Sequence, residues 1–425
     1  IALAALFTIQ CSKEESVVHE IPEANENAPK LNRVFPLMGS SGTIVTLKGE
    51  NLSLATEVYF NGVKSEAIQT GGENEIVAEV PFRAFTGPIK VMFGTDELLG
   101  PEFDYVSSNR VSTLAGSRMG YADGQGLEAE FSHPRGITLT ADGNLLVTDY
   151  NHKIRSITPE GMVGTLTGST ADYADGSFED AKFNNPGSLA PDPFGNLFVS
   201  DIYNHKIRKV FLSGTVVTWS GSSRGFADGF GSAKFNEPKG MAVDAENNIF
   251  VADSENHRIR KISNTGTVTT IAGSDRGFKD GTGAEAKFSY PTDLVLDSEQ
   301  NLYVADAINN RIRKITPQGE VTTYAGGSFG NLDGPALEAQ FGTPTGLALD
   351  ADGTLYVADS GGNRIRKISP NGMVSTIAGS DPGYLDGTGM ESQFNHPWNL
   401  VLDQETHTLY VTDFHNHKIR KILLD

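Results

Sequence analysis

The chain has 425 residues, a formal net charge of −19 and a single cysteine. Its length allows two or more domains, and its 38% apolar residues and 47 glycines are typical of a folded, turn-rich β protein. The acidic balance excludes a broad basic surface for phosphate backbones, so nucleic acid is not an expected partner. A single cysteine excludes an intramolecular disulfide, so the core alone must stabilise the fold.

An apolar run occupies residues 1–10 and ends at Cys11, and charged residues dominate the segment that follows. A run this short cannot span a bilayer, so we interpret it as the end of a signal peptide. A cysteine at such a junction resembles the lipid-acceptor cysteine of bacterial lipoproteins. Residues 12–15, Ser-Lys-Glu-Glu, resemble the signal that directs some of these proteins to the outer face of the outer membrane. We therefore expect a lipid anchor at Cys11, a solvated tether over 11–27 and a location facing the cell exterior.

Residues 28–107 contain short segments of alternating apolar and polar residues. The alternation predicts strands over 43–47, 57–60, 75–80 and 88–93. Asn61-Gly62 and Gly71-Gly72 are typical of hairpin turns, and short strands in a segment of this size predict a small sandwich. The segment resembles an IPT/TIG domain through Pro36, Gly39, Gly42-Thr43, Gly49, Asn51-Leu52 and Asn61-Gly62. That resemblance implies an immunoglobulin-like fold with a spacer or protein-contact role.

One motif recurs six times over residues 109–425. A segment of the form Val-x-Thr-x-small-Gly ends every 52 or 53 residues, at Gly116, Gly168, Gly221, Gly273, Gly326 and Gly379. It is followed by an aromatic-x-Asp-Gly turn, as at 121–124, then by a Phe and, three residues later, a Pro. Three strand-like segments complete each copy. Four short strands per copy predict one propeller blade, and blades must stack around an axis because a single blade cannot bury both faces.

The phase of the repeat predicts how the ring closes. The first copy begins on a fourth-strand motif at 111–116, and the last ends on a third-strand motif at 418–424. We expect residues 110–115 to pair with the C-terminal strand and complete the last blade, which removes an exposed sheet edge. The predicted fold is all-β: a small immunoglobulin-like sandwich over 28–107, then a six-bladed β-propeller over 109–425.

The six copies also resemble the NHL repeat. The resemblance rests on a Val-x-Asp segment followed by Asn-His-[Lys/Arg]-Ile-Arg, present at 147–155, 199–208, 251–260, 304–313, 357–366 and 411–420. It implies a propeller of a kind that commonly acts as a binding platform. Some related six-bladed propellers are lyases or metal-dependent hydrolases, so an enzymatic role stays open.

Residues shared by all copies are best explained by packing, whereas a single ligand site should depend on residues that differ. We expect Asp149 and its repeat counterparts to pair with turn amides or with the repeat arginines, such as Arg155. One repeat position holds His152, His205, His257, His417, Asn310 and Asn363. This exchange favours a turn hydrogen bond over a zinc cluster. The Asp-Gly-x-Gly loops at 123–126, 280–283 and 386–389 resemble calcium loops, but tight turns are favoured because alternating oxygen ligands are missing.

Variable positions point to the mouth of the central channel. The residue after each repeat Pro reads Arg135, Gly187, Lys239, Thr292, Thr345 and Trp398, and the next is Gly or Ser except at Asp293 and Asn399. The loop after each Val-x-Asp should lie on the same face. We predict a site for a sugar or peptide with an aromatic platform and a polar rim, formed by Tyr150, Tyr203, Trp398, Phe414, Arg135, Lys239, Asp293 and Asn399. His133 and His396 are the histidine pair expected to converge near the axis, for a metal or acid/base role.

The tether, the contact-type first module and the missing catalytic constellation favour a surface lipoprotein that binds a glycan, a peptide or a partner protein. It would act as an accessory to an outer-membrane nutrient-uptake complex. The alternative is an enzyme, a lyase or a metal-dependent hydrolase, with its site at the channel mouth. A structural or adhesive role is the third hypothesis. No catalytic residue, metal ligand or cofactor is assigned.

Overall fold

The structure, a computed structural model, describes residues 28–81, 84–106 and 109–425. The chain divides into two compact units, one ending at residue 107 and one starting at residue 108. Both are built from β-strands, and none of the helices described is long and apolar enough to cross a membrane. The expected signal segment over 1–10, Cys11 and the tether over 11–27 lie outside the described residues.

The first unit is a sandwich of two sheets. One sheet has the order β1 (Lys30–Phe35), β3 (Ile44–Glu50), β7 (Glu75–Glu79) and β6 (Ile68–Thr70). The other has the order β2 (Met38–Gly39), β9 (Asp96–Tyr105), β8 (Gly87–Phe93), β4 (Glu57–Phe60) and β5 (Val63–Lys64). The four predicted strands correspond to β3, β4, β7 and β8. The sequence analysis missed β1 and β9, whose residues are mostly exposed and lack clear alternation.

The sandwich core lies between the two sheets. Val45 and Leu47 of β3 face Val58 and Phe60 of β4, and all four side chains are fully buried. The Phe60 ring meets the Phe103 ring edge-on, with 5.2 Å between their centroids. Alternating burial along each strand is therefore what holds this unit together.

The second unit consists of six five-stranded sheets, each formed by one blade and a short outer strand. From the innermost strand outward, blade 1 has β12 (Ile137–Leu139), β13 (Leu145–Asp149), β14 (Lys153–Ile157), β15 (Met162–Thr167) and β11 (Gly124–Gln125). Blade 2 has β17 (Pro186–Pro191), β18 (Leu197–Asp201), β19 (Lys206–Phe211), β20 (Thr215–Ser220) and β16 (Gly176–Ser177). Blade 3 has β22 (Pro238–Val243), β23 (Ile249–Asp253), β24 (Arg258–Ile262), β25 (Thr267–Gly273) and β21 (Gly229–Phe230).

Blades 4 to 6 repeat the same order. Blade 4 has β27 (Pro291–Leu296), β28 (Leu302–Asp306), β29 (Arg311–Ile315), β30 (Glu320–Ala325) and β26 (Gly281–Thr282). Blade 5 has β32 (Pro344–Leu349), β33 (Leu355–Asp359), β34 (Arg364–Ile368), β35 (Met373–Ala378) and β31 (Gly334–Pro335). Blade 6 has β37 (Pro397–Asp403), β38 (Thr408–Asp413), β39 (Lys418–Leu423), β10 (Arg110–Ala115) and β36 (Gly387–Thr388). The predicted six-bladed propeller is therefore confirmed.

Single 3-10 turns follow the second strand of blades 2 to 6 and precede the innermost strand of blades 1, 4 and 6. They are η1 (Gly126–Glu128), η2 (Ile202–Asn204), η3 (Ser254–Asn256), η4 (Gly283–Glu285), η5 (Ala307–Asn309), η6 (Ser360–Gly362), η7 (Gly389–Glu391) and η8 (Phe414–Asn416).

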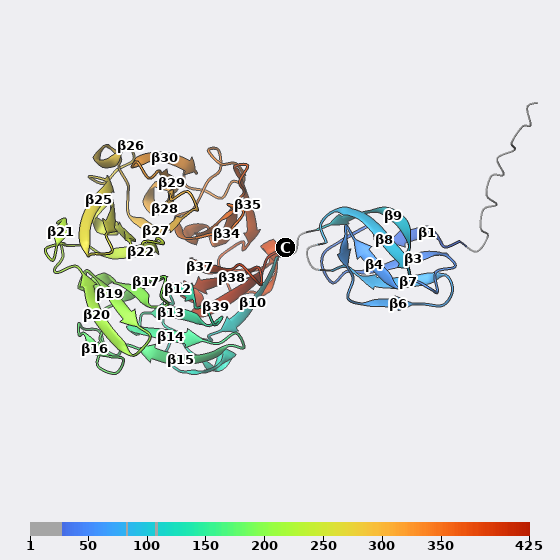
Figure 1. Cartoon of the computed structure of the whole chain (residues 1–425), viewed down its shortest axis with the longest axis horizontal. Coiled ribbons are helices and arrows are strands. Elements are labelled where there is room, and N and C mark those ends of the chain that lie inside the picture. The colour runs from blue at the N-terminus through green and yellow to red at the C-terminus, as the bar shows by residue number, and fades with distance from the viewer. Residues whose placement is uncertain (1–27, 82–83, 107–108) are drawn as a thin grey trace, which may run out of the picture. The chain divides into compact units, whose positions relative to one another are not determined.

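Blade 6 is assembled from both ends of the repeat array. Strand β10 pairs antiparallel with β39, with Val111 opposite Ile422. It also pairs with β36 on its other side. The pairing expected for residues 110–115 is thus present. The innermost strands contact one another in order around the ring, and β37 contacts β12 (Figure 1).

Most of the core lies between neighbouring blades. Phe131, Ile137 and Val147 of blade 1 share one buried cluster with Tyr410 and Ile419 of blade 6. A second cluster joins Tyr356 and Ile365 of blade 5 to residues of blade 6. Each blade therefore buries its faces against its neighbours, as stacked blades require.

A buried arginine on the third strand organises each blade. Arg155 has no exposed surface and pairs with Asp149 at 3.5 Å and with Asp123 at 2.5 Å. The same two ion pairs recur in every blade, at Arg155, Arg208, Arg260, Arg313, Arg366 and Arg420. The expected structural role of the repeat aspartates is confirmed. The aspartates that open the Asp-Gly-x-Gly loops at 123, 280 and 386 are these second partners.

A histidine or asparagine at one repeat position connects five of the six blades to the next. The Nδ1 atom of His152 in blade 1 accepts a hydrogen bond of 3.0 Å from the backbone N–H of Asn185, just before blade 2. Equivalent bonds join His205 to Glu237, His257 to Tyr290 and His417 to His133. In blade 5 the Oδ1 atom of Asn363 accepts the corresponding bond from His396. The predicted hydrogen-bonding role of the His/Asn exchange is therefore confirmed at these five positions, but each bond runs to the next blade and not within a turn.

Candidate functional site

The inter-blade hydrogen bonds hold an unusual backbone at the channel mouth. The residue before each repeat Pro has a positive φ, for instance 49° at His133, 52° at Glu237, 56° at Tyr290 and 54° at His396. Side chains this large rarely adopt this conformation, and a following proline restricts the backbone further. Such strain persists only where the surroundings enforce it. The repeat therefore supplies a second set of variable side chains at the mouth.

An aromatic cluster surrounds Arg135 where blade 6 meets blade 1. Arg135 lies between β12 and the repeat Pro of blade 1, and only 8% of its surface is exposed. Its guanidinium carbon lies 5.1 Å from the ring centroid of Tyr150 and 4.8 Å from that of Trp398. Its Nη2 atom donates a hydrogen bond of 2.9 Å to the Tyr150 hydroxyl. Phe414, on η8, lies against Trp398 with 5.2 Å between centroids. We call these four residues the Arg135 cluster.

Three histidines extend the Arg135 cluster. The His133 ring lies 4.8 Å from Phe414 and 5.6 Å from His415, and His415 lies 4.6 Å from His396, between ring centroids. Burial lowers the pKa of His133, and the nearby His415 and Arg135 lower it further. Burial likewise lowers the pKa of His396. His133 and His396 thus meet through His415, and over the residues described no group of three or more His, Cys, Asp or Glu is placed to hold a metal ion.

A second cation stands at the same mouth in blade 3. Lys239 follows the repeat Pro, and its Nζ atom lies 6.0 Å from the Tyr290 ring centroid. Burial lowers the pKa of Lys239, and the positive charge of Arg135 lowers it further, while Glu237 and Glu255 act in the opposite direction. Arg135 and Lys239 are therefore close enough to repel each other.

Asp293 and Asn399 lie one residue deeper than the expected rim, in the wall of the channel. Only 5% of Asp293 is exposed, and its Oδ2 atom accepts a hydrogen bond of 3.0 Å from the backbone N–H of Leu347. Asn399 also hydrogen-bonds to the Asp293 carboxyl group. Burial raises the pKa of Asp293 to about 7, and these hydrogen bonds only partly oppose that effect.

A cavity of about 230 Å³ occupies the channel at this level. Each innermost strand contributes to its lining: Thr138, Ser188, Met241, Asp293, Leu347 and Leu400. Asp293 is the one titratable residue in that lining. The remaining predicted site residue, Tyr203, is 50% exposed and close enough to Arg135 to affect its pKa. The structure thus brings Arg135, Tyr150, Trp398 and Phe414 into contact and leaves Tyr203 and Lys239 at their edge.

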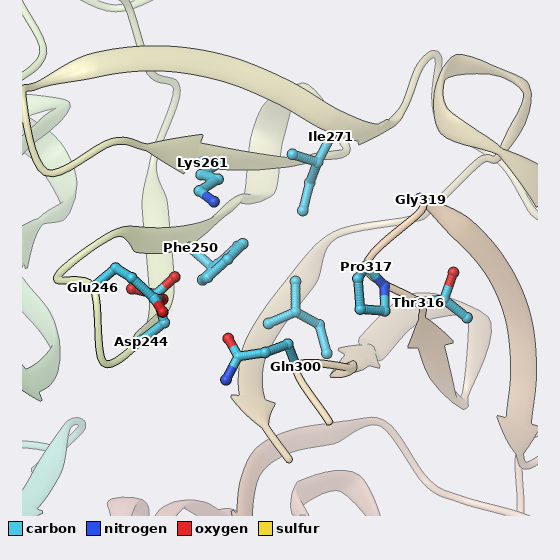
Figure 2. A pocket seen from close by; sticks show the side chains of 10 residues that line it. Asp244, Glu246, Phe250, Lys261, Ile271, Gln300, Thr316, Pro317 and Gly319 are labelled. Atoms are coloured by element: carbon cyan, nitrogen blue, oxygen red, sulfur yellow. The ribbon is translucent and has the colours of Figure 1, made fainter. Parts of the chain in front are cut away.

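A second pocket, of about 280 Å³, lies between blades 3 and 4, at the opposite ends of the strands (Figure 2). Lys261 lies over the Phe250 ring there at 5.3 Å, and Asp244 accepts two hydrogen bonds from Asn248. Blade 2 fills the equivalent space with Trp219, where blade 3 has Ile271. No residue of the predicted site lines this pocket.

The sheet order defines a six-bladed β-propeller that follows an immunoglobulin-like domain in the sequence. Residues 29–112 match the IPT/TIG domain, residues 235–262 and 288–315 match the NHL repeat, and residues 329–423 match the Teneurin NHL domain. The chain carries an IPT/TIG domain followed by NHL repeats, and both resemblances seen in the sequence are confirmed.

Three similar proteins illustrate the range of this fold. The chain is 30% identical over 313 residues to the protein SUPPRESSOR OF QUENCHING 1, chloroplastic, of Arabidopsis thaliana, an alignment that covers 67% of this chain and 30% of that protein. It therefore spans less than a third of that relative's length. An auxiliary nutrient binding protein from Bacteroides ovatus superposes with a TM-score of 0.63 at 18% identity, covering 93% and 97% of the two chains. A streptogramin B lyase superposes with a TM-score of 0.50 at 17% identity, covering 75% and 98%. Identities this low show the fold alone.

Proposed function

We propose that this chain is a surface-exposed lipoprotein whose propeller binds a glycan, a peptide or a partner protein at the channel mouth, as an accessory to outer-membrane nutrient uptake. One observation carries the proposal. The buried guanidinium of Arg135 is stacked on aromatic rings and, within the described part of the chain, has no carboxylate at ion-pair distance. Convergent aromatic and polar groups are typical of a ligand site. The channel cavity of about 230 Å³ is lined by Asn399, which follows Trp398, and by none of the four residues of the Arg135 cluster.

The Arg135 cluster also breaks the six-fold symmetry of the ring. Trp398 occupies a position held by Gly187 or Thr292 in other blades, and Arg135 occupies the same position in blade 1. Packing around the ring does not require these residues, because the other blades pack without them. The Bacteroides ovatus protein of the same fold, named an auxiliary nutrient binding protein, adds support for a role in binding.

Titration calorimetry against a panel of polysaccharides and peptides tests the site. Trp398→Ala should lose at least tenfold in affinity for whichever probe binds, because stacking of the probe on the ring face and the support of Arg135 are both removed. Phe194→Ala is the matched control, since Phe194 is 79% exposed in a turn at the other end of the strands. No binding by the wild type, or equal binding by Trp398→Ala, would contradict the proposed site.

The lipid anchor is a separate part of the proposal. Labelling cells that express the full precursor with radioactive palmitate should mark the wild type and not Cys11→Ala. The variant should leave the membrane fraction, because the acyl chains would provide the attachment. In this arrangement the IPT/TIG domain acts as a spacer or a partner contact. A labelled Cys11→Ala variant would overturn the assignment of the anchor to this residue.

A propeller enzyme is the second candidate, and Asp293 is the observation that favours it. A carboxyl group with a pKa of about 7 beside a cavity is suited to general acid–base catalysis. Assays for lyase and ester-hydrolase activity on the same probes, with Asp293→Asn as the comparison, test this candidate. Turnover by the wild type that Asp293→Asn abolishes would establish it, and unaltered probes after long incubation would reject it.

A further inference from the structure

The arginines of this propeller fall into two groups that differ in their partners. The six repeat arginines have no exposed surface, and each is paired with two carboxylates. Arg135 is nearly as buried, yet its side chain donates a hydrogen bond to a neutral group, the Tyr150 hydroxyl. Its Nε atom is buried and, among the residues that the structure describes, has no hydrogen-bond partner, as is also true of the Nε atoms of Arg313 and Arg420. Burying a cation without an anion is costly, so Arg135 differs from the repeat arginines in lacking a counter-charge.

Lys239 shows the same deficiency. In the described part of the chain, its Nζ atom makes neither an ion pair nor a hydrogen bond. By contrast, the buried Lys209 pairs with Asp192 at 2.8 Å. Glu237 and Glu255 influence Lys239 electrostatically but lie beyond ion-pair distance. Two cations without counter-ions therefore face one mouth, in a chain whose net charge is −19.

The surroundings of these cations indicate which anion fits. Arginine binds a planar carboxylate with two parallel hydrogen bonds. Glu237 and Glu255 beside Lys239 disfavour a dianion such as a phosphate monoester, because like charges repel. The partly exposed rings of Trp398, Tyr150 and Tyr203 offer flat apolar faces within the same mouth. A sugar ring that carries one carboxylate needs only such a face and a cation.

We infer that the ligand of the proposed site is an acidic glycan, and that Arg135 and Lys239 bind the carboxylate of a uronic acid residue. This inference rests on the proposed function and narrows it to one class of ligand. The carboxylate supplies the ion-pair partner that neither cation has within the described part of the chain. The sugar ring stacks on the aromatic faces beside it.

The chain offers a fluorescent probe inside this site. Of its two tryptophans, Trp398 touches Arg135, whereas Trp219 lies in blade 2 and packs against Phe198. Trp219→Phe loses no hydrogen bond seen in the structure, because the indole N–H of Trp219 has no partner among the described residues. In this variant every change in tryptophan emission reports on the mouth.

The full chain carrying Trp219→Phe is titrated with oligomers of galacturonate, glucuronate, mannuronate and guluronate, and with carboxyl-reduced forms of the same oligomers. We expect at least one acidic oligomer to change the Trp398 emission and to bind at least tenfold more tightly than its reduced form. Added NaCl should weaken this binding, since the contact is an ion pair at a partly open surface. Lys239→Met should lower the affinity for the acidic oligomer at least fivefold. Lys279→Met, at an exposed lysine in blade 4, should leave that affinity unchanged.

The remaining outcomes separate the inference from the proposed function. If reduced oligomers bind as tightly as acidic ones, and if Trp398→Ala abolishes both in titration calorimetry, which does not need the Trp398 emission, the binding function holds and the acidic-glycan inference fails. Binding of a glutamate-rich peptide with no response to any uronate also overturns the inference, while keeping the site. A mouth that responds to none of the sugars or peptides contradicts both.

Discussion

The Nδ1 atom of His417, in blade 6, accepts a hydrogen bond of 3.2 Å from the backbone N–H of His133, which precedes blade 1. An imidazole can accept at this atom only when it is not protonated there. Burial lowers the pKa of His417 to about 4, and the nearby His133, His415 and Lys418 contribute to that shift. The contact between the last blade and the first therefore depends on a neutral histidine.

The first prediction concerns the pH dependence of this contact. Because the folded-state pKa of His417 lies below its ordinary value of 6.5, its contribution to stability is complete above pH 6.5 and is lost as the pH falls toward about 4. His417→Asn should keep the hydrogen bond, as Asn363 does in blade 5, and remove this dependence. The unfolding free energy of the variant minus that of the wild type should be about 1 kcal/mol larger at pH 4.5 than at pH 7. This figure is reduced because solvent screens the partly exposed His417. Chemical denaturation at both pH values measures it, with His407→Asn as control.

The second prediction has the opposite sign and concerns Asp293. Burial raises its folded-state pKa from 3.8 to about 7, so its stabilising contribution is complete below pH 3.8 and is lost as the pH rises through about 7. Asp293→Asn imitates the protonated acid. The wild type should lose stability as the pH rises, and the variant should not. The unfolding free energy of the variant minus that of the wild type should therefore be about 1–3 kcal/mol larger at pH 8.5 than at pH 5. Asp381→Asn, at an exposed aspartate, should show no such change, and parallel pH profiles for wild type and Asp293→Asn would contradict the assignment.

The third prediction separates buried from exposed ion pairs. Arg155→Met leaves Asp149 buried without its cation and removes hydrogen bonds to the carbonyls of Ala122 and Glu130. We expect a loss of about 3–5 kcal/mol in unfolding free energy. Arg118→Met breaks an ion pair of 2.6 Å with Glu130, which is shorter than the 3.5 Å between Arg155 and Asp149. The Arg118 side chain is 82% exposed, however, so we expect its loss to cost less than about 1 kcal/mol. Urea denaturation compares the two, and equal losses would refute the scaffold role of Arg155.

The fourth prediction tests the pairing of β10 with β39. Val111 is 1% exposed and lies opposite Ile422, so Val111→Asp places a charge in the core between blades 5 and 6. We expect a loss of about 3 kcal/mol or more. Arg110→Asp, at the exposed neighbouring residue, should cost far less. Deletion of residues 109–116 should lower the melting temperature more than either substitution, and an unchanged melt would show that blade 6 is complete without β10.

Repetition explains why most of the propeller was predictable. The spacing of Gly116 and its counterparts set the blade boundaries. Only glycine fits at Gly116, because φ is 97° there and an added Cβ would lie 2.5 Å from the carbonyl oxygen of His417. Asp149 and Arg155 could be paired because they recur together. Arg135 and Trp398, far apart in the chain, could be placed together because closure makes blades 6 and 1 neighbours.

Features that depend on local geometry escaped the sequence analysis. The alternation along β27 does not show that Asp293 is held against Leu347 of the next blade instead of reaching the rim. The side chains before each repeat Pro, such as Glu237 and Tyr290, are also placed at the mouth by a positive φ that no propensity predicts. These side chains differ from copy to copy, as do the residues after each repeat Pro. This variation was the signal in the sequence that could have assigned them to the mouth.

The assembly of blade 6 from both ends of the array also orders events during synthesis. Residues 110–115 are made before every other strand of the propeller, whereas their partner β39 is made after all of them. Until then, the ring is an open arc with two unsatisfied edges, and a nascent chain in that state offers strands to other chains. Termination of synthesis before β39 would leave the arc permanently open, whatever the quality of the five blades already formed.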